Sequence, residues 1–244
     1  MKKILLLSKN YKVIVVDNLT GGHKKNLRYH EDNPRLKFKK VDIRTMGSGN
    51  AGGTNAFRTQ GVLFALGVIS IDISKGWIAI HYIGTVLSES MGVPSQDIFL
   101  LSLMCGFSSV LGHIYPIYHN LKGGKGAGTL IGVLIGLSLP PYTILILIGI
   151  WLLVLILTGY VGLGTILTGL SFPIYLYISP DVISNELMGF SIACSLLIIF
   201  THRSNIIRMY QSNENQFEKI MKHSGQIKKD SMEKHKIDKK KIKI

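Results

Sequence analysis

The chain has 244 residues, of which 47% are hydrophobic and only 17% charged, against roughly 25% charged in an ordinary soluble domain. Its 28 lysines and arginines outnumber 14 acidic residues and lie mainly at the ends: residues 1–61 carry 13 basic and 4 acidic residues, residues 62–201 carry 3 and 5, and residues 202–244 carry 12 and 5. So few charges over the central block exclude a soluble globular enzyme, a disordered chain and a nucleic-acid-binding domain. The composition indicates an integral membrane protein with two basic ends.

Six apolar segments follow one another along the chain. No signal peptide precedes them, because the apolar run 4–7 is too short for one. A transmembrane helix needs about 20 mostly apolar residues, and the candidates are 62–88, 98–118, 126–138, 140–158, 160–178 and 186–201. We therefore predict an all-α polytopic membrane protein with about six transmembrane helices.

The placement of charge supports this count independently. Six crossings put both termini on one side of the membrane, and both termini are basic. The inward-facing connection after the second span carries Lys122 and Lys125, whereas the outward-facing connections 89–97 and 179–185 contain acidic residues but no lysine or arginine. By the positive-inside rule, both termini and the lysine loop are expected in the cytoplasm.

Two features inside the spans have structural explanations. Asp72 and Lys75 are three residues apart, so they share a helix face and can neutralise each other. A paired structural lock is favoured over a direct chemical role, because the charges match. Cys105 and Cys194 lie in apolar runs without metal-ligand spacing, and we expect both to be buried and free.

The first of four polar clusters at the predicted cytoplasmic ends runs from Gly47 to Arg58. Its four glycines permit positive φ angles and a close approach of the backbone to a ligand, and successive N–H groups can form an anion-binding turn. Arg58 could hold a phosphate by two parallel donors. A dinucleotide fingerprint is also present by pattern, but its acidic residue would be Asp72, inside a predicted span, so NAD binding there is not expected.

The other clusters are individually ambiguous. Gly112–Gly126 presents two lysines at a helix N-terminus, which favours anions but equally fits a positively charged anchor. Thr158–Thr165 is glycine-rich, which also fits close helix packing. His202–Arg208 puts a histidine and an asparagine on one helix face, but alone it also fits a basic anchor. Together the four clusters predict a site for phosphorylated, anionic substrates at the membrane surface.

In their order and positions, these clusters resemble the PlsY family of bacterial glycerol-3-phosphate acyltransferases. The resemblance covers about residues 41–214, through the motifs Asp42–Arg44, Gly47–Arg58, Asp72–Gly76, Gly112–Gly126 and His202–Arg208. It implies a bacterial inner-membrane enzyme of phospholipid biosynthesis. This enzyme would transfer a fatty acyl group from acyl-phosphate to the sn-1 hydroxyl of glycerol 3-phosphate, giving lysophosphatidic acid and phosphate.

The same resemblance implies roles by motif position. The catalytic residues would be Ser48, Arg58, Lys125, His202 and Asn205. Further substrate and phosphate contacts would come from Gly49, Asn50, Thr54, Asn55, Lys122 and Thr165. The expected partners are the two substrates and membrane lipids, with no cofactor, no metal and no nucleic acid. Because acyl-phosphate has a good leaving group, alignment and charge stabilisation can supply most of the catalysis, and a substrate phosphate oxygen could accept the hydroxyl proton.

The sequence departs from the family in two places. The third motif usually reads Arg-Tyr-Val-Ser-Leu-x-Ser, whereas in this chain Gly159 replaces the arginine and Gly162 the first serine, and only Thr165 can substitute for the second serine. The first family helix, which contains Gly-Ser-Ile-Pro, is replaced by residues 1–40. They resemble a strand–loop–strand fragment of a nucleotide-sugar epimerase, in which Asp17 would hold the ribose. No glycine precedes Gly21, so the phosphate-binding turn is absent and NAD is not expected as a partner.

We therefore expect three regions: a small strand-containing appendage at 1–40 that is not an independent domain, an acyltransferase domain at 41–210, and a basic cytoplasmic tail at 211–244. The alternative function is an inactive relative or a non-enzymatic protein that handles anions. A transporter would carry polar residues near the bilayer midplane, in broken helices repeated between two halves. The sequence shows no such repeat, which favours the enzyme.

Overall fold

The computed structural model describes residues 13–17, 33–40, 43–179 and 184–217 and divides the chain into two compact units, residues 1–49 and 50–244. In the first unit, β1 (Val13–Asp17) pairs in parallel with β2 (Leu36–Lys40), and Val13 lies opposite Leu36. A 3-10 turn follows at Ile43–Thr45. The strand-containing appendage is thus confirmed, whereas its likeness to an epimerase fragment stays a prediction. Most of the predicted basic tail, residues 218–244, lies outside the described residues.

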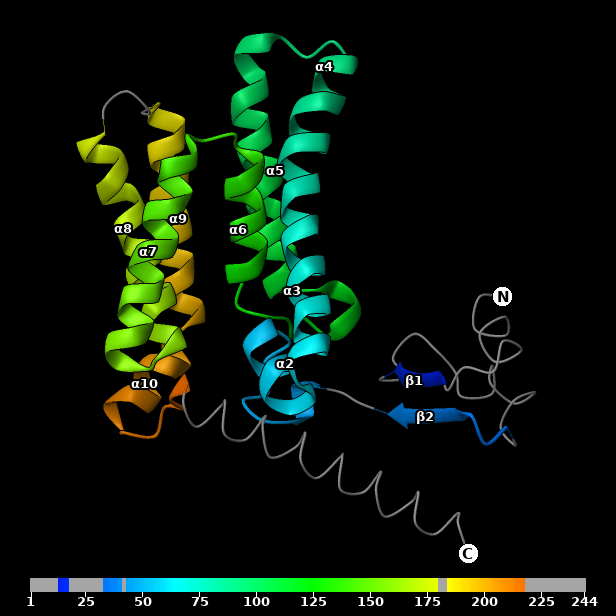
Figure 1. Cartoon of the computed structure of the whole chain (residues 1–244). Helices are drawn as coiled ribbons and strands as arrows, with labels where there is room; N and C mark the ends of the chain where they lie inside the picture. The colour runs from blue at the N-terminus through cyan, green and yellow to red at the C-terminus, as the bar shows by residue number, and fades with distance from the viewer. Residues whose placement is uncertain (1–12, 18–32, 41–42, 180–183, 218–244) are drawn as a thin grey trace, which may run out of the picture. The chain divides into compact units, whose positions relative to one another are not determined.

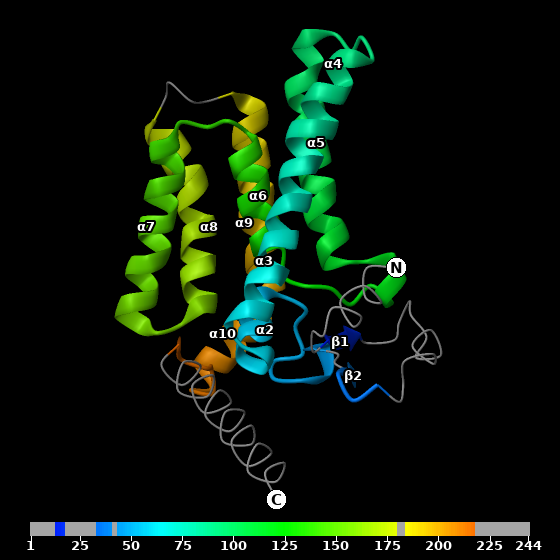
Figure 2. The same cartoon turned by 45° about the vertical axis from the view of Figure 1, so that its right-hand side comes forward.

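The second unit is helical (Figures 1 and 2). Its α-helices are α2 (Gly53–Gln60), α3 (Val62–Trp77), α4 (Ser88–Ser90), α5 (Ser95–Ile114), α6 (Ala127–Gly136), α7 (Pro141–Thr158), α8 (Val161–Ile178), α9 (Asn185–Thr201) and α10 (Arg203–Tyr210). A π-helical stretch, Ile78–Leu87, continues α3, and a 3-10 turn, Ile117–His119, follows α5. The π-helical stretch was not predicted from the regular apolar pattern of residues 62–88.

All six predicted apolar segments form helices, but not all are long enough to cross a membrane. Among the described residues, four spans qualify by length and composition, and α9 with α10, which are bent by 51° to each other, would make a fifth. The difference from the predicted six lies mainly in α6, because its ten residues extend about 15 Å, half of the roughly 30 Å of hydrocarbon.

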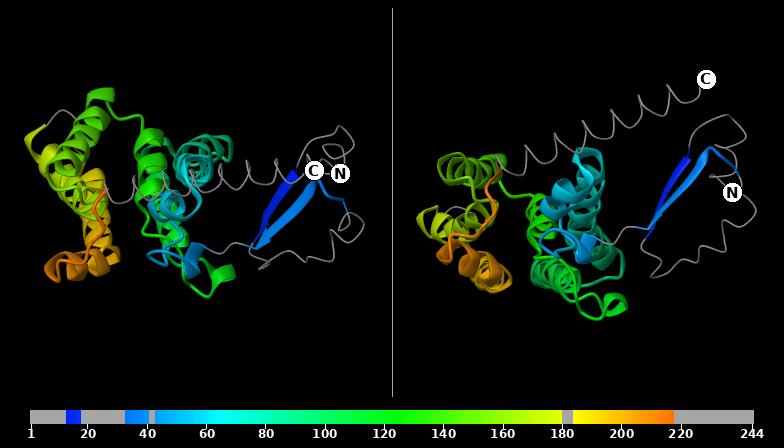
Figure 3. Two further views of the ribbon diagram at one scale, coloured as in Figure 1. Left: turned by 60° about the horizontal axis from the view of Figure 1, so that its bottom comes forward. Right: turned by 90° about the horizontal axis from the view of Figure 1, so that it is seen from below.

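The six apolar helices pack as two groups, which the right-hand view of Figure 3 shows end-on: α3, α5 and α6 in one, and α7, α8 and α9 in the other. α5 contacts α9 and joins the groups, and buried side chains of both contribute to one hydrophobic core. α3 and α6 approach each other closely enough for backbone contact. A Cβ at Gly76 would overlap the Thr129 carbonyl, and one at Gly132 would overlap the Ile73 carbonyl. Glycine is therefore required on both sides of this contact.

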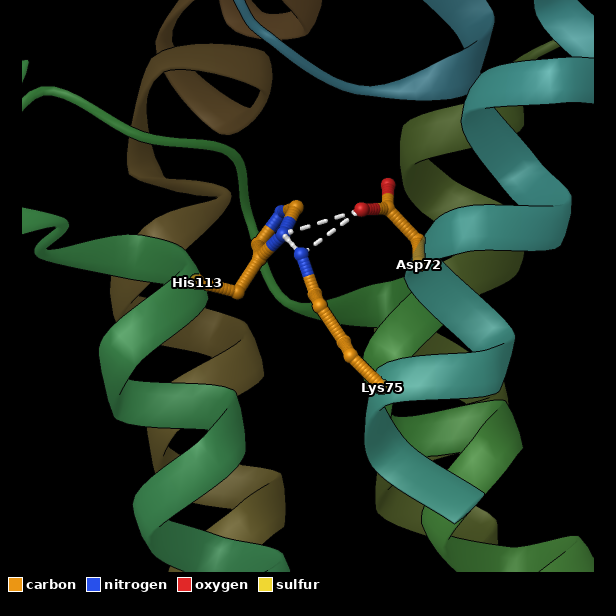
Figure 4. A network of polar contacts seen from close by, with 3 residues as sticks. All are labelled: Asp72, Lys75 and His113. Atoms are coloured by element: carbon orange, nitrogen blue, oxygen red, sulfur yellow. Dashed lines mark hydrogen bonds and ion pairs between the residues drawn. The ribbon is translucent and has the colours of Figure 1, made fainter. Parts of the chain in front are cut away.

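A polar network connects α3 to the end of α5. Lys75 Nζ lies 2.7 Å from Asp72 Oδ1, which confirms the predicted pairing, and the Lys75 ammonium also contacts His113 Nδ1. His113 is a third member that the sequence did not reveal (Figure 4). Its ring packs directly against Gly124 in the loop between α5 and α6, so that a Cβ at position 124 would overlap the ring.

Gly124→Ala should therefore destabilise the protein. Overpacking against the His113 ring is expected to lower the free energy of unfolding by about 2 kcal/mol. The check is a comparison of thermal unfolding midpoints in detergent. Gly149→Ala is the matched control, because a Cβ there meets nothing within 4 Å, and alanine favours the helix that glycine weakens. Equal midpoints for the Gly124 variant and the wild type would contradict this account of the loop.

Candidate active site

The glycine-rich turn before α2 adopts the predicted conformation at two positions. Gly47 and Gly49 have φ angles of 58° and 71°, which favour glycine. These glycines and Ser48 end the first unit, and Asn50 begins the second. The buried Asn55 donates from Nδ2 to the Asn50 carbonyl at 2.9 Å, so its amide holds the entry to α2, whereas Thr54 is exposed.

Arg58 lies on α2, near its C-terminal end, and is half-buried. Its Nε is buried and has no hydrogen-bond partner among the described residues. Burial lowers the pKa of Arg58 from its ordinary value, the Glu214 carboxylate opposes this shift, and the positive charge of Arg208 adds to it. A buried guanidinium with an unused donor is suited to receiving an anion.

A chain of polar contacts crosses the same end of the bundle. The Lys125 ammonium, in the loop before α6, donates to Asn205 Oδ1 on α10. Asn205 in turn donates from Nδ2 to Glu214 Oε1 at 2.9 Å, and Arg208 Nε donates to Glu214 Oε2 at 2.7 Å. The side chain of Glu214 is only 6% exposed, so a buried carboxylate anchors both α10 side chains.

Lys125 is held by its backbone as well. Thr201 Oγ1, at the end of α9, donates to the Lys125 carbonyl at 3.0 Å. Burial lowers the pKa of Lys125 to about 8, mainly because the charged ammonium loses hydration, and Arg208 and Arg58 add repulsion that Glu214 partly offsets. We call Arg58, Lys125, Asn205, Arg208 and Glu214 the cationic cluster.

His202 is buried at the junction of α9 and α10. Its Nδ1 donates to the Ile198 carbonyl at 2.9 Å, which leaves the ring lone pair on Nε2. Asn205, one turn further, packs against Gly162 of α8, where a Cβ would lie 2.6 Å from the asparagine Nδ2. Gly162, a glycine of the third motif, therefore makes room for the Asn205 side chain.

The hydroxyl of Thr165 is engaged within the bundle. It donates to the Val161 carbonyl at 3.0 Å and accepts from Trp151 Nε1 at 3.3 Å. Lys122, unlike Lys125, is exposed to solvent. Of the predicted catalytic residues, the second unit thus brings Arg58, Lys125, His202 and Asn205 to one end of the bundle, while Ser48 belongs to the first unit.

Sequence reasoning assigned no site role to Arg208 or Glu214. Arg208 ends the fourth motif, so its basic side chain was a visible signal. Glu214 stands alone after α10 and had no recognisable spacing. Its importance follows from a loop that returns it to Arg208 and Asn205.

The cluster can bind an anion electrostatically. Its three cations and one carboxylate leave two positive charges in a partly buried site, where their attraction for an anion is stronger than in water. Among the described residues, no group of three or more histidine, cysteine or acidic side chains is placed to hold a metal ion. The arrangement supports binding and charge stabilisation of an anion.

Known proteins share this sequence and fold. The glycerol-3-phosphate acyltransferases of Chlorobaculum tepidum and Chlorobium phaeobacteroides are 37% and 36% identical, over 73% and 77% of this chain and 85% and 89% of their own lengths. The crystal structure of PlsY, an integral membrane glycerol 3-phosphate acyltransferase, in its glycerol 3-phosphate form matches with a TM-score of 0.62 and 28% identity, over 89% of this chain and 96% of that one. Its lysophosphatidic acid form matches with a TM-score of 0.60 and 30% identity, over 72% and 84%.

The family assignment rests on most of the chain. Residues 35–212 match the sequence profile of glycerol-3-phosphate acyltransferases. The apolar helices and the integral membrane relatives agree that the protein is a multi-pass membrane protein. The chain belongs to the glycerol-3-phosphate acyltransferase family.

Proposed function

We propose that this protein transfers a fatty acyl group from acyl-phosphate to the sn-1 hydroxyl of glycerol 3-phosphate. The products are lysophosphatidic acid and phosphate, and the reaction is the first step of phospholipid synthesis. The observation that supports this most directly is the convergence of Arg58, Lys125 and Arg208 around one carboxylate. The chain is also similar to PlsY, whose crystal structures include a glycerol 3-phosphate form and a lysophosphatidic acid form.

In this reaction the sn-1 oxygen attacks the acyl carbonyl carbon, and the bond between that carbon and the phosphate oxygen breaks. The hydroxyl proton passes to an oxygen of the departing phosphate, so no strong protein base is needed. Arg58 and Lys125 neutralise the phosphates of the two substrates, and this charge stabilisation supplies much of the catalysis. His202 and Asn205 position the glycerol, because both lie at the start of α10, beside Lys125.

The remaining contacts are assigned by motif position alone. Ser48 and the Gly49 amide are assigned to a phosphate, and Asn50 to a substrate contact. Thr54, Asn55, Lys122 and Thr165 are assigned weaker contacts by motif position alone. The enzyme lies in the bacterial inner membrane with both termini and the cationic cluster on the cytoplasmic side, because the lysine loop is the basic connection.

The proposed reaction is tested by phosphate release from purified protein in detergent. Acyl-phosphate with glycerol 3-phosphate should release phosphate and form lysophosphatidic acid, whereas coenzyme A thioesters should not replace the donor. Arg58→Gln should lose about 100-fold or more of the turnover, since a buried charge donor is removed. Arg203→Gln is the matched control, because this arginine is exposed at the start of α10. Absence of lysophosphatidic acid from the wild type would favour the non-enzymatic alternative.

The pH profile should depend on Lys125. This residue is charged below its pKa of about 8 and neutral above it, so its attraction for phosphate is lost as the pH rises through that value. Consequently, kcat/KM for glycerol 3-phosphate should fall by about tenfold per pH unit well above pH 8. Lys125→Arg keeps its charge and should lack this decline, at a lower maximum. Lys122→Arg, in the same loop, should retain the decline, and a decline that persists in Lys125→Arg would contradict the assignment.

His202→Gln separates positioning from proton transfer. If a substrate phosphate accepts the proton, the variant should keep turnover within about 100-fold of the wild type, since general bases contribute that much or more. The measurement is kcat together with the dissociation constant of glycerol 3-phosphate. Complete loss of turnover with unchanged binding would favour a histidine base instead.

A further inference from the structure

Asp72, Lys75 and His113 form a network that the proposed reaction does not use (Figure 4). Lys75 Nζ lies 2.7 Å from Asp72 Oδ1, and the same carboxylate oxygen lies 3.3 Å from His113 Nδ1. The side chains of Asp72 and His113 are 11% and 7% exposed, whereas that of Lys75 is 37% exposed. One carboxylate and one ammonium make the network electrically balanced within the membrane-spanning helices.

Lys75 and Asp72 both contact His113 at Nδ1. These two contacts fix the orientation of the imidazole ring. The Nε2 edge of the ring packs against Gly124. The network therefore sets the orientation of the ring surface on which the loop rests.

The loop is tied to the same place by its backbone. Gly124 N donates to the His113 carbonyl, and Gly123 N donates to the Ile114 carbonyl, each at 3.1 Å. The first turn of α6 also packs against the network, since a Cβ at Gly128 would lie 3.0 Å from the Asp72 Cβ. Lys125 stands between these attachment points and is held from the other side by Thr201.

We propose that Asp72, Lys75 and His113 are positioning residues for Lys125. The inference builds on the proposed function and adds a second support for the ammonium that binds phosphate. The network fixes the His113 ring and the end of α5, these fix Gly123 and Gly124, and the backbone then delivers Lys125 to Asn205. The three residues act through the loop and have no role in touching the substrates.

The kinetic test compares variants of His113 in the full chain. His113→Ala removes the ring and its polar Nδ1, and should lower kcat/KM for glycerol 3-phosphate by about 100-fold, the cost of a displacement of about 1 Å. His113→Asn retains a polar atom at the position of Nδ1 and should recover most of this loss. Thr143→Val is the control, because it breaks a buried 3.0 Å hydrogen bond to Tyr175 between α7 and α8, away from the loop.

If the network is only a structural lock, all three variants lower the thermal unfolding midpoint and none lowers kcat/KM for the folded protein. That result overturns the proposal. A selective loss in His113→Ala with recovery in His113→Asn supports it.

Hydrogen exchange gives a readout that does not depend on turnover. Peptides covering residues 115–126 should exchange faster in His113→Ala, since the amides of Gly123 and Gly124 lose their fixed acceptors, but not in His113→Asn or Thr143→Val. Should the wild type show no acyl transfer, the proposed function fails while this exchange pattern still supports the positioning of Lys125. Unchanged exchange in His113→Ala overturns the positioning role whatever the activity.

Discussion

The arrangement of the site depends on one buried carboxylate. Glu214 accepts hydrogen bonds from Asn205 and Arg208, and its negative charge partly offsets the burial of Arg58 and Lys125. Because Asn205 uses its Nδ2 for Glu214, its oxygen is directed to the Lys125 ammonium. A buried cation without a partner would be strongly unfavourable, whereas full neutralisation would leave nothing to attract an anion. A single carboxylate among three cations lies between these extremes.

Several glycines of the sequence motifs and of α6 are required for packing. Gly124 makes room for the His113 ring, Gly162 for the Asn205 side chain, and Gly76 and Gly132 for the backbone contact between α3 and α6. A glycine motif in a membrane enzyme is readily interpreted as a phosphate-binding loop. Here these glycines allow the helices to come close enough for Lys125 to contact Asn205. Close packing alone therefore accounts for these glycines.

The sequence predicted what depends on local pattern. Apolar runs located the six long helical segments but not the short helices α2 and α10, and the i, i+3 spacing identified the pairing of Asp72 with Lys75. It could not predict contacts between residues far apart in the chain, such as His113 with Lys75 or Glu214 with Asn205, because no spacing rule connects them. The shortness of α6 was missed for a related reason: hydropathy continues through residues 126–138, but the backbone leaves the helix after Gly136.

The ten-residue length of α6 also determines how deep in the bundle the loop before it lies. α6 extends about 15 Å and α7 about 27 Å, and the two helices are joined by a short connection at one end of the bundle (Figure 1). Lys125, two residues before the first residue of α6, is thus recessed from the opposite end, where α7 finishes. In the proposed reaction, glycerol 3-phosphate must give up part of its hydration shell to reach Lys125, while acyl-phosphate can keep its hydrocarbon tail among the bilayer chains. Substrates of opposite solubility can in this way meet at one ammonium group.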